Sequence, residues 1–283
     1  MLTPSVALTI AGSDSGGGAG IQADLKTFAA LGVLGASAVT ALTAQNTQGV
    51  RGVHPVPAAF VVEQVHTVLD DLSVAAVKTG MLATVEIVAA VAELAAAGQL
   101  PNLVVDPVMV SSSGDRLLDP AAERLYPEVL VPHAAVLTPN LLEAEVLLGT
   151  RIRTLAEQHD AARALGALGA RVVVVKGGHA VADTPDEAVD VVWDGHTTSE
   201  LRATRVRTRN NHGTGCTFAS AIAAGLARGQ STADAVSAAK DYVRRAVEGA
   251  ATWEVGGGHG PIDHFGWAVD ASVTPPPTRL PSR

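Results

Sequence analysis

Residues 6–23 read VALTIAGSDSGGGAGIQA, an apolar run that leads into a glycine-rich loop. Residues 6–11 are apolar without alternation, which is typical of a parallel strand buried on both faces. The glycines of 12–20 let backbone amides approach a ligand, and the helix expected from about Ile21 presents its positive end to the loop. This stretch predicts an α/β fold with a binding loop directly after its first strand.

The same order of elements repeats along the chain. Helical periodicity at 60–69, 87–94 and 161–168 alternates with further short apolar runs, and a capping box formed by Thr154 and Glu157 precedes the third of these helices. The expected strands are residues 36–42, 75–78, 103–106, 135–137 and 171–176. Alternation of this kind predicts a doubly wound, mostly parallel sheet with helices on both faces.

The last third of the chain departs from this alternation. Residues 188–193 and 196–206 flank the turn pair Asp194-Gly195 and predict an antiparallel hairpin at the edge of the sheet. Two long helices are expected after it, over 214–228 and 232–249, the second capped by Ser231. A single domain over 1–270 accounts for these elements, and the proline-rich residues 271–283 are expected to be a disordered tail.

Composition excludes several classes of protein. The 283 residues are 47% hydrophobic and carry a net charge of −8, which argues against nucleic acid or an anionic membrane as the main partner. One cysteine excludes a disulfide framework and a multi-cysteine metal cluster. The N-terminus lacks the basic region of a signal peptide, and no apolar run reaches the ~20 residues of a membrane span. We therefore expect a soluble, cytoplasmic protein.

The glycine loop permits more than one interpretation. Gly18–Ala23 matches the G-x-G-x-x-A dinucleotide fingerprint, but no acidic residue ends the second strand to bind a ribose. The loop is not a Walker A motif either, since no Gly-Lys-Ser/Thr sequence closes it. A nicotinamide oxidoreductase is thereby disfavoured. The remaining alternatives are an anion-binding loop and a turn made for close packing.

Polar residues also follow the next two strands. The amide of Gln45 suits a heterocycle with a ring nitrogen beside an amino group, although it could equally be an ordinary loop residue. Lys78 opens a Lys-Thr-Gly-Met sequence, where it could simply cap the sheet edge. Met81 is either core or an adaptable apolar wall for a flat ring.

Three further strand ends carry charge or amides. Asp106 could hold Mg²⁺ through water or cap the following turn. Asn140 and Glu143 form a capping box by spacing, and Glu143 is also a possible Mg²⁺ carboxylate. Lys176, at the exit of a buried strand and followed by two glycines, is expected to contact a phosphate.

The strongest local signal is Asn-Asn-His-Gly-Thr-Gly-Cys at 210–216. Gly213, Thr214 and Gly215 open an Ala-rich helix, so their backbone amides converge at a positive helix end and predict an anion hole. Cys216 lies in the first turn, where the helix dipole is expected to lower the thiol pKa. Its thiolate could accept a proton, and the alternative is a buried structural cysteine.

Taken together, these segments resemble the hydroxymethylpyrimidine/phosphomethylpyrimidine kinases of thiamine biosynthesis, a branch of the ribokinase-like superfamily. The resemblance covers about residues 6–264 and rests on AGSDSGGGAGIQADLKT, ALTAQNT, KTGM, VDPVM, LTPNLLEA, VKGGH and HGTGC in that order. It implies a sheet of about eight strands, a homodimer, and the use of ATP and Mg²⁺. The implied substrate is 4-amino-5-hydroxymethyl-2-methylpyrimidine, phosphorylated once and then again.

The resemblance also implies a role for each matching residue. Pyrimidine recognition falls to Gln45, with Gly12 and Asp14 nearby and Met81 and Val108 against the ring. The Mg²⁺–phosphate region contains Asp106 and Glu143, and the nucleotide side contains Asn140 and Lys176. The anion hole is Gly213, Thr214 and Gly215, and Cys216 takes the general-base position.

Two other functions remain open at this point. A pyridoxine/pyridoxal kinase shares the glycine loop and the GTGC-type turn, so the choice of ring depends largely on Gln45 and Met81. A non-catalytic vitamin sensor on the same fold would not need Asp106, Lys176 and Cys216 together.

Overall fold

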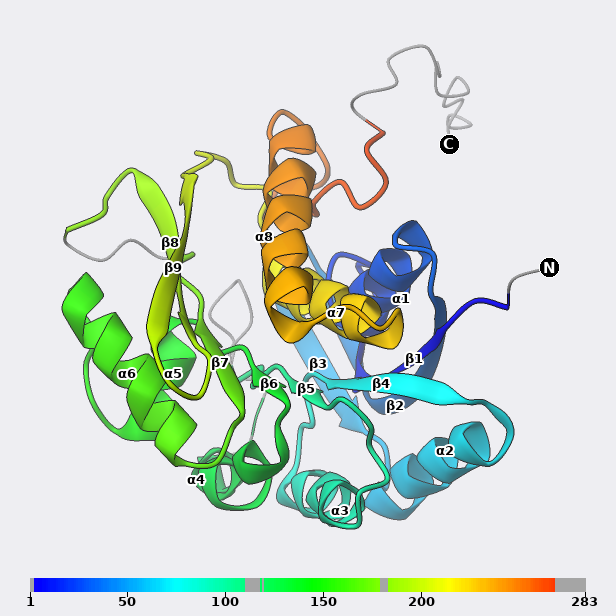
Figure 1. The fold of residues 1–283 in the computed structure, drawn as a ribbon. Coiled ribbons are helices and arrows are strands. Elements are labelled where there is room, and N and C mark those ends of the chain that lie inside the picture. The colour runs from blue at the N-terminus through cyan, green and yellow to red at the C-terminus, as the bar shows by residue number, and fades with distance from the viewer. Residues whose placement is uncertain (1–2, 110–117, 119, 179–182, 268–283) are drawn as a thin grey trace, which may run out of the picture.

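A computed structural model describes residues 3–109, 118, 120–178 and 183–267 (Figure 1). Its centre is a nine-stranded sheet in the order β3-β2-β1-β4-β5-β6-β7-β8-β9. The strands are β1 (Val6–Asp14), β2 (Leu34–Asn46), β3 (Gly49–Pro55), β4 (Val74–Thr79), β5 (Val104–Val105), β6 (Val136–Leu137), β7 (Val172–Val175), β8 (Glu187–Trp193) and β9 (Thr198–Thr204). The six central strands β2, β1, β4, β5, β6 and β7 pair in parallel. At one edge β3 pairs antiparallel with β2, and at the other the antiparallel hairpin β8–β9 pairs antiparallel with β7.

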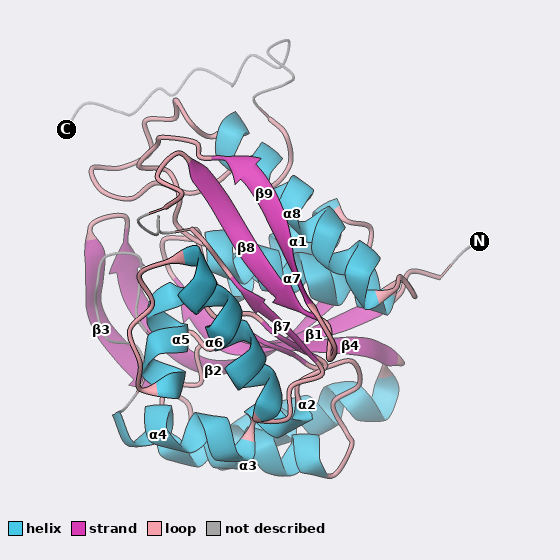
Figure 2. Cartoon of the chain, turned by 60° about the vertical axis from the view of Figure 1, so that its left-hand side comes forward, coloured by secondary structure: helices cyan, strands magenta, loops and turns pink. Residues whose placement is uncertain are grey.

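Helices cover both faces of this sheet (Figure 2). They are α1 (Gly20–Ala30), α2 (Ala58–Asp71), α3 (Val85–Ala96), α4 (Pro120–Val129), α5 (Leu141–Leu148), α6 (Leu155–Ala167), α7 (Thr214–Ala227) and α8 (Thr232–Gly249), with a 3₁₀ turn at Val131–His133. Apolar side chains of α2 to α6 pack on one face, and those of α1, α7 and α8 pack on the other. The predicted doubly wound α/β architecture is confirmed.

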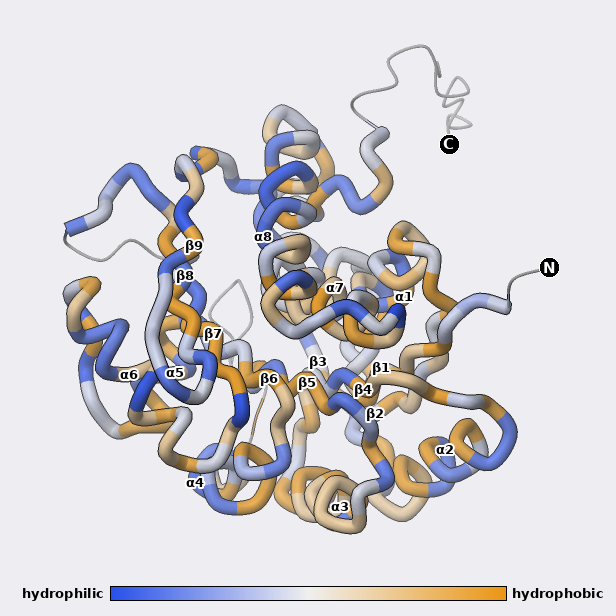
Figure 3. Tube along the Cα trace, viewed as in Figure 1, coloured by the Kyte–Doolittle hydropathy of each residue, from blue (hydrophilic) through white to orange (hydrophobic). Residues whose placement is uncertain are grey.

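Helix α7 is the most deeply placed helix. Every residue from Cys216 to Ala227 is buried, because the helix lies between the sheet, α1 and α8. Its alanines allow this close approach on all sides, and the resulting apolar character around the whole helix is typical of a core element. Figure 3 colours most of α7 and of the central strands beside it as hydrophobic.

The predicted strands all exist, but their lengths differ from the prediction. The first two are longer than expected: β1 continues through Gly12 to Asp14, and β2 runs on to Asn46, so Gln45 lies in the strand. The strands expected at 103–106 and 135–137 shorten to two residues each, because their neighbours leave the ladder once the chain reaches the site.

Strand β3 was not expected from the sequence. Its residues Gly49–Pro55 are half-buried or exposed, and they include Arg51, His54 and two glycines. A strand that pairs only with β2 at an open edge needs no apolar face, so hydrophobic periodicity cannot reveal it. With this strand the sheet has nine strands, in agreement with the expectation of about eight.

Local signals at helix ends and turns are confirmed. Thr154 caps α6 and forms the capping box with Glu157, and the helix begins directly afterwards at Leu155. The β8–β9 hairpin turns over residues 194–197, where Gly195 has φ +98° and Oδ1 of Asp194 accepts from the backbone amides of His196 and Thr197. Ser231 caps α8 as expected.

Two predictions concern the ends and the surroundings of the chain. The tail predicted at 271–283 lies outside the described residues, as does the last part of the predicted 1–270 domain. Among the helices of the described residues, none is long and apolar enough to cross a membrane.

Candidate functional site

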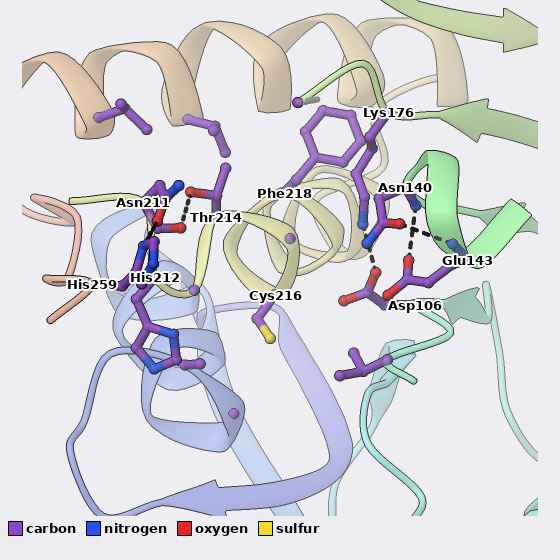
Figure 4. A pocket seen from close by; sticks show the side chains of 18 of the residues that line it. Asp106, Asn140, Glu143, Lys176, Asn211, His212, Thr214, Cys216, Phe218 and His259 are labelled. Atoms are coloured by element: carbon purple, nitrogen blue, oxygen red, sulfur yellow. Dashed lines mark hydrogen bonds and ion pairs between the residues drawn. The ribbon is translucent and has the colours of Figure 1, made fainter. Parts of the chain in front are cut away.

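All the predicted site residues line one cavity of about 740 Å³ at the carboxyl ends of the parallel strands. The cavity extends from the glycine loop and β2, past the first turn of α7, to α8 and the hairpin β8–β9. It forms where it does because parallel strands end at the same edge of a sheet, so the loops after them converge. Figure 4 shows side chains of this cavity, with Cys216 between the histidines on one side and Lys176, Asp106 and Glu143 on the other.

The carboxylate of Asp14 organises the glycine loop. Its oxygens accept hydrogen bonds from the backbone amides of Gly16, Gly18 and Ala19 and contact Nε2 of His212 at 2.9 Å. Burial raises the pKa of Asp14, but the bonds from His212 and the amides outweigh that effect and hold the pKa below its ordinary value. Since these donors already occupy the carboxylate, the structure assigns Asp14 to shaping the loop, and its predicted part in substrate binding stays a prediction.

Close packing joins this loop to the turn before α7. Gly213 has φ +82°, and a Cβ there would overlap the carbonyl oxygen of Gly18. A Cβ at Gly18 would in turn overlap the ring of His212. The two glycine-rich segments therefore lie against each other, which confirms the close-packing interpretation of the loop, and anion binding by its backbone stays a prediction.

An apolar slot lies beside the glycine loop. Met81 packs with Ala41 and Val108, and a Cβ at Gly12 would overlap the Met81 methyl group. Gln45 lies at the polar end of the slot, with its amide nitrogen 3.4 Å from Nε2 of His212. An apolar wall with a polar amide at one end suits a flat ring with polar atoms on one edge.

The N-terminus of α7 faces a lysine and a carboxylate. The first amides of a helix have no acceptor within the helix, and the helix dipole makes this end positive. A Cβ at Gly215 would lie 3.3 Å from Nζ of Lys176 and 3.9 Å from Oδ2 of Asp106. The predicted anion hole thus has an ammonium group directly beside it, which suits a phosphate.

Asp106, Lys176 and Glu143 form a charged group at this end of the cavity. Lys176 contacts Oδ1 of Asp106 at 2.8 Å, and this oxygen also accepts from Thr138. Burial lowers the pKa of Lys176, yet the two carboxylates raise it above its ordinary value. The pKa of Glu143 is raised to about 7: burial is the main cause and Asp106 acts in the same direction, while Lys176 and backbone hydrogen bonds act against them.

The capping box at α5 is confirmed and uses the same Glu143. The Asn140 side chain accepts from the Glu143 amide at 2.9 Å, and Glu143 accepts from the Asn140 amide at 2.8 Å. The capping role and a place in the charged group are therefore not alternatives. Glu143 caps the helix from inside the cavity.

These residues fit a hard divalent cation bound together with phosphate. Oδ2 of Asp106 is buried and has no hydrogen-bond partner among the described residues, and Glu143 lies close enough to Asp106 for each charge to affect the other. Mg²⁺ commonly uses one or two carboxylates and completes its shell with water and phosphate oxygens. Within the described part of the chain, no group of three or more His, Cys, Asp and Glu side chains could hold a metal alone.

The expectation for the Cys216 thiol is wrong in one respect. Burial raises the pKa of Cys216 to about 11, although the charge of Lys78 and a backbone hydrogen bond at Gly20 act to lower it. Position at a helix N-terminus favours a thiolate, but it does not offset the loss of solvent around a buried sulfur.

Lys78 and Asp24 were missed as partners. Lys78 lies in the central strand β4, not at a sheet edge, and its ammonium contacts both oxygens of Asp24 at 2.9 Å with neither side chain exposed. Asp24 lies within the glycine-loop helix, and nothing in its local sequence marks it as a partner. His212 was also missed, although it lies inside the quoted 210–216 motif.

Apolar residues at the far end of the cavity were missed as well. They come from α5 and α8, which face each other across the cavity mouth beyond Lys176, and are Leu142, Val146, Val243 and Val247. Lys240 lies beside them and pairs with Asp190 at 2.8 Å. Their signal is only that of ordinary amphipathic helices, so the sequence does not distinguish them from core.

Comparison with known proteins gives consistent matches. Residues 14–263 match the sequence profile of the family described as phosphomethylpyrimidine kinase. Hydroxymethylpyrimidine/phosphomethylpyrimidine kinases are 52% identical in Rhizobium meliloti (92% of this chain, 97% of the relative) and 51% identical in Streptomyces coelicolor (95% and 97%). Among solved structures, an ADP complex of Bacillus subtilis pyridoxal kinase superposes with a TM-score of 0.86 at 39% identity, covering 95% of this chain and all of that one.

The raised pKa of Glu143 leads to a prediction about stability. A carboxyl whose pKa is higher in the folded state stabilises the fold below its unfolded pKa, and this stabilisation is lost as the pH rises through about 7. Glu143→Gln keeps the capping interaction and cannot ionise. Relative to the wild type, we expect this variant to become more stable from pH 5 to pH 8, by about 1.4 kcal/mol for each unit of pKa shift.

Urea unfolding of both proteins at several pH values measures this difference. Glu157→Gln makes the same change in the exposed capping box of α6 and serves as the matched control. A stability difference between Glu143→Gln and wild type that stays constant over this range would contradict the prediction.

Proposed function

Because the chain belongs to the phosphomethylpyrimidine kinase family, we propose that it phosphorylates 4-amino-5-hydroxymethyl-2-methylpyrimidine and then the resulting monophosphate, with ATP as the donor. The product would be the pyrimidine diphosphate used in thiamine biosynthesis. One observation carries the proposal: an apolar slot and the positive N-terminus of α7 line the same cavity, and Cys216, in the first turn of that helix, lies between the histidines and Lys176 (Figure 4).

The slot accounts for ring recognition. Met81 and Val108 would contact the faces of the pyrimidine, and the amide of Gln45 would pair with the 4-amino group and the adjacent ring nitrogen. Gly12 admits the Met81 methyl group to this wall. The hydroxymethyl group, on the ring carbon next to the one that carries the amino group, would then face Cys216.

The other end of the cavity accounts for the nucleotide. Lys176 and the amides of Gly213, Thr214 and Gly215 would bind the phosphates, and the apolar residues of α5 and α8 would flank the base. Stabilisation of charge on the migrating phosphoryl group is the main demand of this reaction. Asn140 reaches this region through its capping bond at the start of α5.

Mg²⁺ would be held by Asp106 and Glu143, where it would neutralise phosphate charge. The buried, unpartnered oxygen of Asp106 supports this assignment. Before Mg²⁺ binds, Lys176 serves as the counter-ion of Asp106.

Cys216, in its thiolate form, would accept the proton of the attacking hydroxyl group. In the first step the substrate oxygen loses its proton to the sulfur and bonds to the γ-phosphorus, while the bond to the β-phosphate breaks and ADP leaves. In the second step the acceptor is a phosphate oxygen that is already ionised near neutral pH. The need for a proton acceptor is then smaller.

Pyridoxal phosphorylation is the alternative that the sequence left open. The solved pyridoxal kinase is 39% identical to this chain, against 52% for the pyrimidine kinase of Rhizobium meliloti. The higher sequence identity over nearly the full length therefore favours the pyrimidine as the substrate.

The predicted cytoplasmic location stays a prediction.

The proposal predicts a definite substrate preference. ADP release with Mg-ATP should be rapid with the hydroxymethylpyrimidine and with its monophosphate, and slow with pyridoxal under identical conditions. A coupled spectrophotometric assay measures all three. Preference for pyridoxal would overturn the assignment of the ring while leaving the phosphate end of the cavity as described.

Cys216→Ala provides a prediction about the two steps. A general base typically contributes ~10²–10⁴-fold, so we expect a loss of that order in kcat for the hydroxymethylpyrimidine, with binding of the pyrimidine retained. The second phosphorylation should lose much less, and single-turnover kinetics on each acceptor measures both. Equal losses in the two steps would contradict a role in proton transfer, and near-full turnover would remove Cys216 from the mechanism.

The proposed assembly is a homodimer that uses the β3 edge of the sheet. Large apolar side chains are exposed on β2, β3 and α2: Leu34, Leu42, Val53 and Phe60. Exposed apolar side chains often mark an interface, and Leu42 pairs with His54 directly at this edge. The described β9 edge instead carries ion pairs such as that of Arg202 with Glu187.

Light scattering coupled to size exclusion measures the assembly. We expect twice the chain mass for the wild type and the mass of one chain for Leu42→Glu. Leu168→Glu, at another exposed leucine that follows α6, is the control and should stay dimeric. A monomeric wild type at micromolar concentration would rule out the proposed homodimer.

A further inference from the structure

An ion pair lies fully buried beneath the cavity. Lys78 on β4 and Asp24 on α1 contact each other at 2.9 Å, and both side chains are completely inaccessible to solvent. A buried ion pair gives little or no stability over apolar residues of similar volume, because both charges lose their hydration. A contribution to core stability therefore does not explain this ion pair. Its position beside the cavity suggests a functional role instead.

Hydrogen bonds fix the carboxylate of Asp24 on all sides. Its Oδ1 accepts from Ser220 and its Oδ2 from Thr9, each at 2.7 Å, besides the contacts with Lys78. An ammonium has three protons, and the hydrogen bonds of Lys78 within the described residues go to Asp24 alone. Asp24 thus anchors a lysine that keeps donor capacity for another group.

Two helices place Cys216 next to this lysine. On α7, Cys216 and Ser220 are four residues apart and share one face, and Ser220 contacts Asp24. On α1, Gly20 hydrogen-bonds to Cys216, and Asp24 lies four residues further on. Both helices therefore set the sulfur one turn away from the ion pair, and Lys78 and Cys216 line the same cavity.

Four charged groups act on Cys216 from the surrounding elements. Lys78 on β4 favours the thiolate, whereas Asp24 on α1 and Asp106 after β5 disfavour it. Lys176, after β7, also interacts with Cys216 but is paired with Asp106. Burial raises the pKa of the thiol, and Lys78 is the largest influence in the opposite direction.

We propose that Lys78, anchored by Asp24, is the positioning residue that stabilises the thiolate of Cys216. The catalytic importance of a stabilised thiolate rests on the proposed function, in which the sulfur accepts the hydroxyl proton. The ammonium of Lys78 is bound to Asp24 and inaccessible to solvent, so it acts through Cys216 and has no need to touch either substrate.

Titration of the sulfur tests this directly. The chain has one cysteine, so ¹³Cβ-cysteine NMR of the full protein reports Cys216 alone. Lys78→Met should raise its pKa by about one unit or more, the smaller end of what a nearby opposite charge does. Asp24→Asn keeps the shape of the anchor and one of its two acceptor oxygens but removes the negative charge that offsets Lys78, so it should lower the pKa of Cys216.

Opposite shifts in these two variants support the proposal, because damaged packing would not produce a change of sign. No shift in Lys78→Met, or shifts in the same direction, would overturn it. Where Lys78→Met alone fails to fold, the double variant Asp24→Asn/Lys78→Met removes both charges and should still raise the pKa. Lys240→Met is the matched control, since it removes another paired lysine of the cavity without affecting the titration.

Kinetics distinguishes this inference from the proposed function. Lys78→Met should lower kcat for the hydroxymethylpyrimidine about tenfold or more, with little change in its KM and a smaller loss on the monophosphate. If the wild-type protein phosphorylated neither pyrimidine, the proposed function would fail, and the NMR titration would still decide whether Lys78 stabilises the thiolate.

Discussion

The contact between Asp14 and His212 is the constraint on which the site depends. These residues are far apart in the sequence, yet their side chains meet at 2.9 Å and join the loop after β1 to the turn before α7. The same carboxylate holds the amides of the glycine loop, and His212 also approaches Gln45. One buried contact therefore sets the ring slot, the glycine loop and the helix end relative to one another.

Two ion pairs flank the sulfur of Cys216, one on each side. Lys176 pairs with Asp106 on the phosphate side, and Lys78 pairs with Asp24 beneath it. Each lysine offsets a carboxylate that would otherwise be isolated in a medium of low polarity. The arrangement keeps cations next to a helix end without leaving any of them unpaired before a substrate arrives.

Much of this could be predicted from the sequence because the information is local. Apolar runs such as 171–176 identify buried strands, and the rule that parallel strands end at one edge brings Gln45, Asp106 and Lys176 into one cavity. The capping box of Asn140 and Glu143 can be inferred from spacing alone. The kinase family follows from the order of the motifs.

What could not be predicted depends on partners distant in the chain. Nothing near Asp24 indicates that it meets Lys78, and the residues of β3 have no periodic pattern because an open edge imposes none. The pKa of Cys216 was misjudged for the same reason. A helix N-terminus is visible in the sequence, whereas the degree to which the fold excludes water from one sulfur is not.

The two edges of the sheet have different consequences for self-association. An unpaired outer strand is a template on which another chain can extend the sheet, and charged side chains discourage this. The hairpin β8–β9 ends the sheet with Glu187, Glu200 and Arg202 in mutual ion pairs. Growth into open-ended fibres requires both edges to be adhesive, so a protein with one charged edge can form closed pairs while resisting polymerisation at high cellular concentration.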